Sequence, residues 1–343
     1  MSRRPLTLLV AGLAVVAAAV VAAFVPVPYV ILSPGPTLNT LGTSGGKPVI
    51  QIQGHPVHPS TGNLDMVTVN FQGGPGNEIN IFTALRAWLS PRNAIVPQSE
   101  VFGSGKSQQQ VLRQDIQQMA SSQQAATAAA LCQLDIRFQT VDTIFATESG
   151  MPAAGVLRKG DVITAVDGQP VGCRATASDL LSRVRPGTPV ELTIRRDGRL
   201  QQIRVRTTQF QGRAVVGVQV VESFEFPFSV RISVGNIGGP SAGLMFALAI
   251  IDKLSGSDLA GGKVVAGTGE ITTNGTVGPI GGIQQKMAGA RASGATVFLV
   301  PADDCSDARS AIPAGLRLIK VSTLAGAMQD LRALNSGQPV PSC

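Results

Sequence analysis

The residue best suited to chemistry in this chain is Ser241, which lies in a Gly-Gly-Pro-Ser-Ala-Gly segment at residues 238–243. An apolar, helix-like run follows from residue 244 onward. Glycine and proline ahead of a helix form a tight entry with exposed backbone N–H groups, and the helix N-terminus favours developing negative charge. A serine there has the accessible hydroxyl and the oxyanion donors that acyl transfer needs. The alternative is a plain helix N-cap, and the hexapeptide alone leaves both interpretations open.

A second segment, residues 265–301, offers a base for that serine. Its pattern predicts two short strands with an Asn-Gly turn at residues 274–275, a helix over residues 283–293 with Lys286 in its first turns, and a strand over residues 296–300. The helix dipole disfavours a lysine near the N-terminus, and burial lowers its pKa further, so a neutral amine becomes available as a base. The alternative is an exposed lysine on a polar helix face, which the two preceding glutamines allow.

Histidine and metal chemistry are poorly supported by comparison. The two histidines, His55 and His58, lie in the loop-like stretch GHPVHPSTG, whereas a Ser-His-Asp triad needs an imidazole held in position. The sequence contains no HExxH, which excludes a helix-borne zinc protease of that type. A metal site at this histidine pair is an alternative that we do not favour, and we expect neither a metal nor a cofactor. A hydrolase of this composition is expected to use Lys, Asp or Glu as its base.

Together the two segments resemble the proteolytic domain of the Lon family. The family's GPSAG is present at residues 239–243, and its pattern TGEIT-x-x-G-x-V-x-PIGG-x-x-x-K is present without a gap at residues 268–286. The resemblance covers roughly residues 208–335. It implies a small α/β domain in which Ser241 is the nucleophile, Lys286 is the general base, and Thr268 supplies the hydroxyl that orients the lysine amine.

Two departures from the family pattern bear on function. Many Lon enzymes carry an acidic residue three positions before the nucleophile, where this chain has Gly238, so any role of that carboxylate in gating or charge balance is absent. The chain also contains no GxxxxGK[ST] nucleotide-binding loop, and the nearest match, at residues 103–107, lacks the spacing. We therefore expect no ATP-driven unfolding, and we expect substrates that are extended or already loosely folded.

Residues 149–171, SGMPAAGVLRKGDVITAVDGQPV, belong to a compact β-rich module. The pattern predicts a strand over residues 162–166, a helix over residues 178–184, and a hairpin over residues 190–206 that turns at an Asp-Gly pair. The small-small-Gly-x-Leu, KGDVI and VDGQPV motifs resemble a PDZ domain of the kind fused to bacterial envelope proteases. The resemblance implies a groove that binds an extended peptide as an added strand. We expect its carboxylate-binding segment at residues 138–144, which lack the usual Gly-Leu-Gly-Phe and leave terminal-carboxylate specificity open.

The N-terminus predicts a membrane anchor. Residues 6–25 are uncharged and apolar on every side, and at ~1.5 Å per residue they span a hydrocarbon core of ~30 Å. Arg3 and Arg4 precede them, and no positive charge follows until Lys47. The positive-inside rule then places the N-terminus in the cytoplasm and the rest of the chain outside. A cleaved signal peptide is the alternative, although the small-residue triplets lie inside the apolar run.

Between the anchor and the PDZ-like module the sequence is mixed and carries little sign of chemistry. It predicts strands over residues 49–52 and 65–70, which flank the histidine loop, and helices over residues 81–89 and 108–131. The net charge of +7 comes partly from an arginine run in the module, which predicts a solvated hairpin rather than a contact with acidic lipid or nucleic acid. With one Trp and one Tyr, the chain offers little for base stacking, so we expect no nucleic-acid partner. The arginines of the run are Arg195, Arg196, Arg199, Arg204 and Arg206.

The chain has four cysteines, an even number that permits two disulfides in an exported domain. Pairing Cys132 with Cys173 and Cys305 with Cys343 keeps each bond within one expected domain. This pairing is a hypothesis that rests on the position of the cysteines near the domain limits.

The sequence therefore predicts a multidomain α+β protein with a mixed α/β middle region, a β-rich PDZ domain and an α/β Lon-type proteolytic domain. The expected divisions are a cytoplasmic N-terminus at 1–5, a transmembrane signal anchor at 6–25, an extracytoplasmic α/β region at 26–130, the PDZ domain at 131–207, the Lon-like domain at 208–335 and a C-terminal tail at 336–343.

The expected function is ATP-independent cleavage of unfolded or extended polypeptides at the outer side of the membrane, by a Ser-Lys dyad, with substrates selected by the PDZ groove. The alternative from another class is an envelope scaffold whose Lon-like domain is inactive. The presence of Ser241 and Lys286, which an inactive domain is free to lose, favours the enzyme. An acyl hydrolase for non-peptide substrates is disfavoured by the PDZ-like module. The expected partners are polypeptides and the membrane, and the resemblance implies a hexameric ring.

Overall fold

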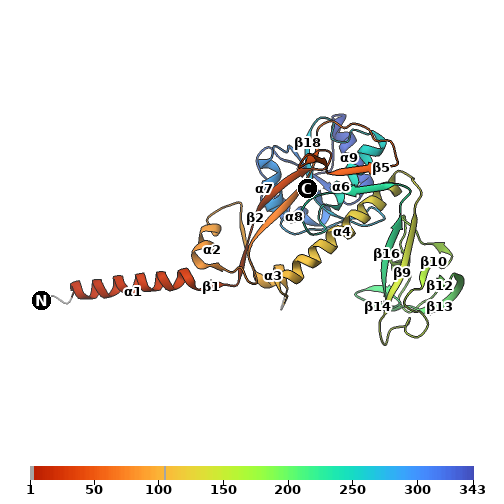
Figure 1. Cartoon of the computed structure of the whole chain (residues 1–343), viewed down its shortest axis with the longest axis horizontal. Coiled ribbons are helices and arrows are strands. Elements are labelled where there is room, and N and C mark those ends of the chain that lie inside the picture. The colour runs from red at the N-terminus through yellow and green to blue at the C-terminus, as the bar shows by residue number, and fades with distance from the viewer. Residues whose placement is uncertain (1–3, 104–105) are drawn as a thin grey trace.

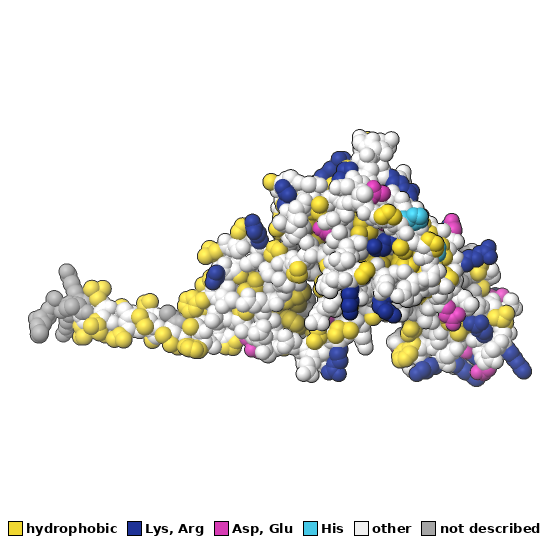
Figure 2. Space-filling model, turned by 45° about the horizontal axis from the view of Figure 1, so that its top comes forward, with side chains coloured by type: hydrophobic (Ala, Val, Ile, Leu, Met, Phe, Trp, Pro, Cys, Tyr) yellow, Lys and Arg dark blue, Asp and Glu magenta, His cyan; other side chains and the backbone are white. Residues whose placement is uncertain are grey.

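The computed structural model describes residues 4–103 and 106–343, which form an N-terminal helical arm, a larger α/β body and a smaller β-rich lobe (Figure 1). The arm is α1 (Arg4–Phe24), which projects away from the body. Its segment Leu6–Phe24 has a mean hydropathy of 2.7 and is not buried against the rest of the chain. On the face seen in Figure 2, the described part of this helix shows hydrophobic side chains and no charged ones. The expected apolar helix is confirmed, and its length and composition suit either a membrane span or a signal sequence.

The body is built on one mixed sheet with the strand order β22-β21-β18-β6-β2-β8. β22, β21, β18 and β6 run parallel to one another, and β2 lies antiparallel between β6 and β8. Parallel strands of this kind are buried on both faces, so their sequences are nearly continuous Val, Leu and Ile. The strands are β2 (Tyr29–Asn39), β6 (Asn63–Gly73), β8 (Ala94–Pro97), β18 (Val264–Gly267), β21 (Val297–Pro301) and β22 (Arg317–Val321).

Helices cover both faces of this sheet, and alternate strand residues face opposite ways. Val265 and Val297 pack into one apolar cluster with α6 (Gly243–Ser255) and α4 (Gln108–Gln133), whereas their neighbours Ala266 and Phe298 pack into another with α7. α6 is buried along nearly its whole length, which explains why its sequence is apolar on every side. The other helices of the body are α2 (Ile81–Trp88), α3 (Gln98–Phe102), α7 (Ile283–Ala292), α8 (Cys305–Arg309) and α9 (Leu324–Asn335).

The region before the β-rich lobe is part of the body, in contrast to the separate region expected at residues 26–130. β2 and β6 lie in the same sheet as β18, and α4 packs against α6. β5 (Ile50–Gln53) also pairs with β17 (Ser229–Ile232), which follows the lobe in sequence. The lobe is thus an insertion between α4 and β17. Sequence patterns did not show this because strand partners far apart in the chain leave no local signal.

The β-rich lobe contains a sheet with the order β13-β12-β10-β9-β16, against which α5 (Ala177–Ser182) packs. The predicted strand at residues 162–166 and the hairpin that turns at residues 197–198 are both present. Of the arginine run on that hairpin, Arg196 forms an ion pair of 2.6 Å with Asp161, and the others are exposed to solvent. The strands are β9 (Gln139–Thr147), β10 (Val162–Val166), β12 (Pro189–Arg196), β13 (Arg199–Arg206) and β16 (Val218–Glu225).

The free edge of this sheet differs from the sequence-based expectation. Residues 138–144, expected to form a carboxylate-binding segment, lie mostly in β9, which pairs with β10 on one side and β16 on the other. On the outer side of β9 the edge strand is β16, which lies within the range expected for the proteolytic domain, and β13 forms the other edge of the sheet. The segment is a central strand because residues 218–225 return from beyond the module and cover its outer edge.

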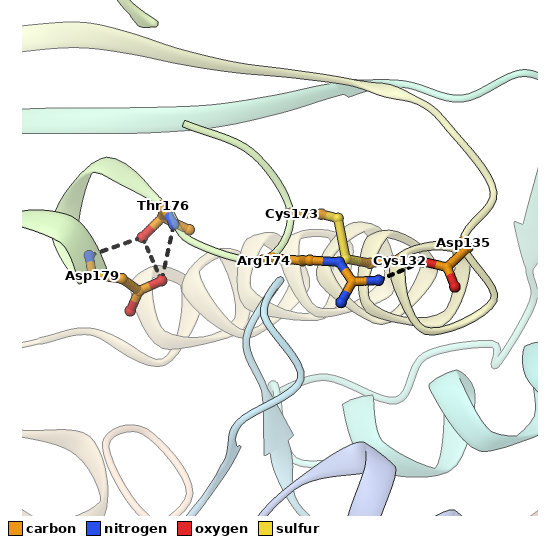
Figure 3. Close-up of a disulfide and its surroundings, with 6 residues drawn as sticks. All are labelled: Cys132, Asp135, Cys173, Arg174, Thr176 and Asp179. Atoms are coloured by element: carbon orange, nitrogen blue, oxygen red, sulfur yellow. Dashed lines mark hydrogen bonds and ion pairs between the residues drawn. A yellow bond between two sulfur atoms is a disulfide. The ribbon is translucent and has the colours of Figure 1, made fainter. Parts of the chain in front are cut away.

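Both hypothetical cysteine pairs are disulfides in the structure. The bond between Cys132 and Cys173 does not stay within the lobe as expected, because Cys132 lies in the last turn of α4. It therefore joins the body to the loop before α5, beside an ion pair between Arg174 and Asp135 (Figure 3). The bond between Cys305 and Cys343 ties the C-terminal tail to the body.

Candidate active site

Ser241 lies at the entry to α6, but it does not cap that helix. The N-cap residue is Ala242, and no side chain makes the capping hydrogen bond. The preceding Gly239 has a φ of +86°, a conformation that favours glycine and sets up the sharp entry. The Ser241 hydroxyl is partly exposed and is directed at Lys286, so the capping interpretation does not apply.

Lys286 lies in the first turn of α7, and its side chain is directed into the protein. The residue is 4% exposed, which excludes the interpretation as a surface lysine. Its Nζ atom lies 2.9 Å from Ser241 Oγ and 3.1 Å from Thr268 Oγ1. The structure thus brings together the three residues on which the sequence analysis converged, although they are spread over 46 positions of the chain.

Thr268 fixes the orientation of the lysine amine. It is 1% exposed, and its hydroxyl donates to the carbonyl oxygen of Ser241 at 3.0 Å. Because that hydrogen is engaged, the Thr268 oxygen is left to accept an N–H from Lys286. An amine that gives one N–H to Thr268 can turn its lone pair toward the Ser241 hydroxyl, which is the arrangement that proton abstraction needs.

Burial lowers the pKa of Lys286 to about 8, and this effect is opposed by the negative charges of Asp304 and Glu270. The amine is thus substantially neutral at mildly alkaline pH. Neither carboxylate was predicted from the sequence to belong to the site. Glu270 was visible within the TGEIT motif, but Asp304 follows β21 and reaches the site only through the tertiary fold.

The loop before Ser241 is held by α4. The backbone N–H of Gly239 donates to the Asp115 carbonyl at 3.0 Å, and the Ser122 hydroxyl donates to the Pro240 carbonyl at 2.9 Å. Within the described chain, the backbone N–H groups of Ser241 and Ala242 have no hydrogen-bond partner. They lie at the N-terminus of α6, where a developing oxyanion is favoured.

Gly238 occupies the position at which many members of the resembled family carry an acid. A Cβ atom there would lie 2.7 Å from the Cβ atom of Asp115, so the close approach of α4 requires glycine. Burial raises the pKa of Asp115, which lines the same cavity as Ser241. The cavity therefore has a carboxylate at this point, supplied by α4 and not by the nucleophile loop.

A cavity of about 820 Å³ opens beside Ser241 and Lys286. Its walls come mainly from α4, the second half of β6, the loop at residues 236–242 and α3, and they include the apolar side chains of Phe71, Phe102 and Leu112. β6 pairs with β18 only over residues 63–66, so over residues 67–73 β2 is its sole partner among the described strands. The unpaired edge of β6 therefore lies in a cavity that also contains the dyad.

His55 and His58 lie in the loop expected for them and do not contribute to this cavity. In the described part of the chain, no group of three or more His, Cys, Asp or Glu side chains has the arrangement of a metal site.

Comparison with known proteins assigns both modules. Residues 134–207 match the family model of the PDZ domain, and residues 229–331 match that of the Lon protease (S16) C-terminal proteolytic domain. The chain therefore contains a PDZ domain and a proteolytic domain of the Lon type. The matched ranges agree with the insertion of the PDZ domain into the body.

Curated relatives match the Lon-type domain. Over 101 residues the chain is 41% identical to Lon protease 1 of Sorangium cellulosum, which is 29% of this chain and 12% of that protein. Over 89 residues it is 40% identical to Lon protease 1 of Bacillus subtilis, which is 25% of this chain and 11% of that protein. The chain thus spans about a tenth of the length of these relatives.

Solved structures match the PDZ domain. The PDZ domain of the SdrC-like protein of Listeria innocua is 21% identical, with a TM-score of 0.22, over 23% of this chain and 92% of that one. The corresponding domain from Listeria monocytogenes is 22% identical, with a TM-score of 0.21, over 23% of this chain and 86% of that one.

Proposed function

We propose that this protein is an ATP-independent serine endopeptidase in which Ser241 is the nucleophile and Lys286 is the general base. The observation that carries the proposal is the 2.9 Å contact between Ser241 Oγ and a buried Nζ atom whose pKa is lowered to about 8. A buried lysine with this partner has little structural reason to be there, because burying a cation destabilises the fold unless the charge is compensated.

The reaction follows from the geometry. Neutral Lys286 takes the proton of Ser241 while Oγ attacks the peptide carbonyl, and the backbone N–H groups of Ser241 and Ala242 hold the oxyanion. The lysine ammonium then protonates the leaving amine, and the acyl-enzyme remains. Lys286 next takes a proton from water, which attacks the ester, and Ser241 recovers its proton when the product leaves. Thr268 keeps the amine in the same orientation during both acylation and deacylation.

The substrate is expected to be an extended segment of polypeptide. The unpaired edge of β6 over residues 67–73 offers backbone groups to a chain that passes Ser241, and strand addition requires the substrate to be unfolded locally. The chain has no nucleotide-binding loop with the GxxxxGK[ST] pattern, so its substrates must already be loose.

The PDZ domain is proposed to select these substrates at the free edge of β16. Val220 and Val221 are 36% and 53% exposed on that strand, and among the described strands only β9 pairs with it. An exposed apolar edge of this kind is a template for a further strand. We place the activity outside the cytoplasm, because the two disulfides need an oxidising compartment. We also place it close to a membrane in which α1 is anchored.

The test is cleavage of an unfolded, fluorescently labelled casein by the full chain and by Ser241→Ala, Lys286→Met and Thr268→Val. The first two variants are expected to lose at least ~10³-fold in kcat, because neither half of the dyad acts alone. Thr268→Val is expected to lose ~10-fold to 100-fold, because the base stays but its orientation is lost.

Circular dichroism of each variant controls for folding, and added ATP is expected to leave the rate unchanged. Equal turnover by the wild type and Ser241→Ala would overturn the proposed mechanism, and no turnover by the wild type would favour an inactive, PDZ-containing scaffold.

A further inference from the structure

A turn of the proteolytic domain reaches the PDZ domain. β19 (Glu270–Ile271) and β20 (Val277–Gly278) form a hairpin, and its connecting residues 272–276 extend to the PDZ lobe. The Thr273 hydroxyl donates to Glu222 Oε2 on β16 at 2.8 Å, and Thr273 is 3% exposed. A hydrogen bond to a carboxylate is among the stronger polar contacts in a protein, and this one is partly buried.

The neighbouring residue makes a second contact with the same lobe. The Asn274 amide donates to Asp179 Oδ2 at 2.9 Å. Asp179 also accepts from Thr176 at the N-terminus of α5, as Figure 3 shows. The side-chain oxygen Oδ1 of Asn274 is engaged within the turn, where it accepts from the Thr276 N–H at 3.0 Å. The amide is therefore held in one orientation, and the turn connects the two domains through these two side-chain hydrogen bonds.

The other end of this hairpin bears directly on the nucleophile. Gly269 donates its N–H to the Ser241 carbonyl at 2.8 Å and accepts from the Leu244 N–H at 3.1 Å. A Cβ atom at Gly243 would lie 2.6 Å from the Ile271 side chain, so β19 packs closely on the first turn of α6. Thr268, which orients the base, lies only five residues before Thr273. A displacement of the turn at residues 272–276 would therefore also displace β19, which packs against the residues around Ser241.

A second connection between the PDZ domain and the body starts close to α5. Cys173, a few residues before α5, is bonded to Cys132 at the end of α4 (Figure 3). Further along α4, Asp115 and Ser122 hold the backbone of residues 239 and 240. The disulfide and the hairpin therefore both join the surroundings of α5 to the loop that carries Ser241.

We propose that Glu222 and Asp179 of the PDZ domain are positioning residues for the dyad, which they hold in its reactive geometry through Thr273 and Asn274. This inference rests on the proposed protease function. It makes the PDZ domain a structural part of the active site as well as a module for substrate selection. A peptide that pairs with β16 would lie on the strand that carries Glu222, so its binding reaches the dyad through the same contact.

The first test compares kcat and KM on a short peptide substrate for Glu222→Ala, Glu222→Gln and Glu225→Ala in the full chain. Glu222→Ala is expected to lower kcat ~10-fold and to leave KM within ~2-fold, because the substrate still binds while the dyad is displaced. Glu222→Gln keeps an acceptor for Thr273 and is expected to retain most of the activity. Glu225 is exposed on the same strand, so its variant serves as the matched control.

The second test exchanges the partners of the Asn274 contact. Asn274→Asp places two carboxylates against each other and is expected to lower kcat ~10-fold or more. Adding Asp179→Asn restores a donor opposite an acceptor and is expected to recover at least half of the wild-type kcat. Thermal melting of each variant shows whether the chain is folded. Wild-type kcat in Asn274→Asp, or no recovery in the double variant, would overturn the inference.

Hydrogen exchange separates this inference from the proposed function. In Asn274→Asp, the amides of Gly269 and Leu244 are expected to exchange faster, and in the double variant they are expected to return to wild-type protection. Unchanged protection at both amides overturns the positioning role whatever the activity. If the wild type proves no more active than Ser241→Ala, the protease proposal fails, and the exchange result still decides whether the two domains are coupled.

Discussion

At the scale of single residues, the site depends on how a buried cation is balanced. Lys286 is almost completely buried, yet it has no direct ion pair among the described residues. Burial favours its neutral form, and the charges of Asp304 and Glu270 limit the fall in its pKa. Asp304 is itself fixed, because its Oδ2 atom accepts from the Ile280 N–H at 3.0 Å. At a pH near this pKa of about 8, a large share of the amine is neutral and can accept a proton, and the rest is charged and can donate one.

The pH dependence of cleavage follows from this balance. Only the neutral amine accepts the Ser241 proton, so the rate is expected to rise ~10-fold per pH unit below the pKa of Lys286, about 8, and to level off above it. Asp304→Asn removes a negative charge that raises this pKa, so the midpoint is expected to move to lower pH and the rate at pH 7 to increase ~2-fold or more.

The measurement is kcat/KM against pH for the wild type, Asp304→Asn and Asp303→Asn. Asp303 is exposed beside Asp304 in sequence, so its variant controls for the general loss of a charge. A wild-type profile that is flat from acid to alkaline pH, or a midpoint that moves upward in Asp304→Asn, would contradict the role of Lys286 as a base.

At the scale of elements, short turns and hairpins make the contacts between neighbouring elements of the PDZ domain. The β12–β13 hairpin carries the arginine run, and its Arg196 forms an ion pair with Asp161 in the turn before β10. Arg196 gives two hydrogen bonds to Asp161, at 2.7 and 2.6 Å, and Asp161 also accepts from the Arg158 N–H at 2.8 Å. The Asp161 side chain is 2% exposed, so its charge depends on these partners.

Removal of this carboxylate is expected to loosen the PDZ domain. Asp161→Ala leaves a half-buried arginine and a backbone N–H without their acceptor, which typically costs about 3 kcal/mol. The expected result is a lower melting transition for the PDZ domain in calorimetry of the full chain. Asp197→Asn, which removes an exposed charge at the tip of the same hairpin, is the control and is expected to melt as the wild type does.

At the scale of the whole molecule, the PDZ domain is inserted into the proteolytic body and covalently tied back to it. The Cys132–Cys173 bond joins residues 41 positions apart across the two parts. The replacement of both cysteines by serine is expected to lower the free energy of unfolding by about 3 kcal/mol, because the unfolded chain regains the freedom of that loop.

The measurement is thermal melting together with limited proteolysis between the two domains. Faster cleavage of the connection near residue 134 is expected in the double variant. A double variant of Cys305 and Cys343 removes the other disulfide and is expected to free the C-terminal tail without exposing that connection. Equal protease sensitivity of the wild type and the Cys132/Cys173 variant would show that the disulfide is not needed to hold the PDZ domain in place.

The sequence by itself determined the local elements and pointed to the two residues of the proposed dyad. Ser241 and Lys286 were predicted because a tight helix entry and the motif at residues 268–286 each lie in consecutive residues. The apolar N-terminal helix and the β12–β13 hairpin were predicted for the same reason, since their patterns are local. Thr268 was assigned from the same motif, and its contact with Lys286 followed in the structure.

Only the tertiary structure decided how distant segments combine. It placed β2 and β6 in the sheet of the proteolytic domain, made β16 an edge strand of the PDZ sheet, and brought Asp304 close enough to influence Lys286. Strand pairing and the burial of a charge depend on residues separated by tens or hundreds of positions. Strand pairing and charge burial leave no periodic pattern or motif in the sequence. Both depend on which apolar surfaces pack against each other when the whole molecule folds.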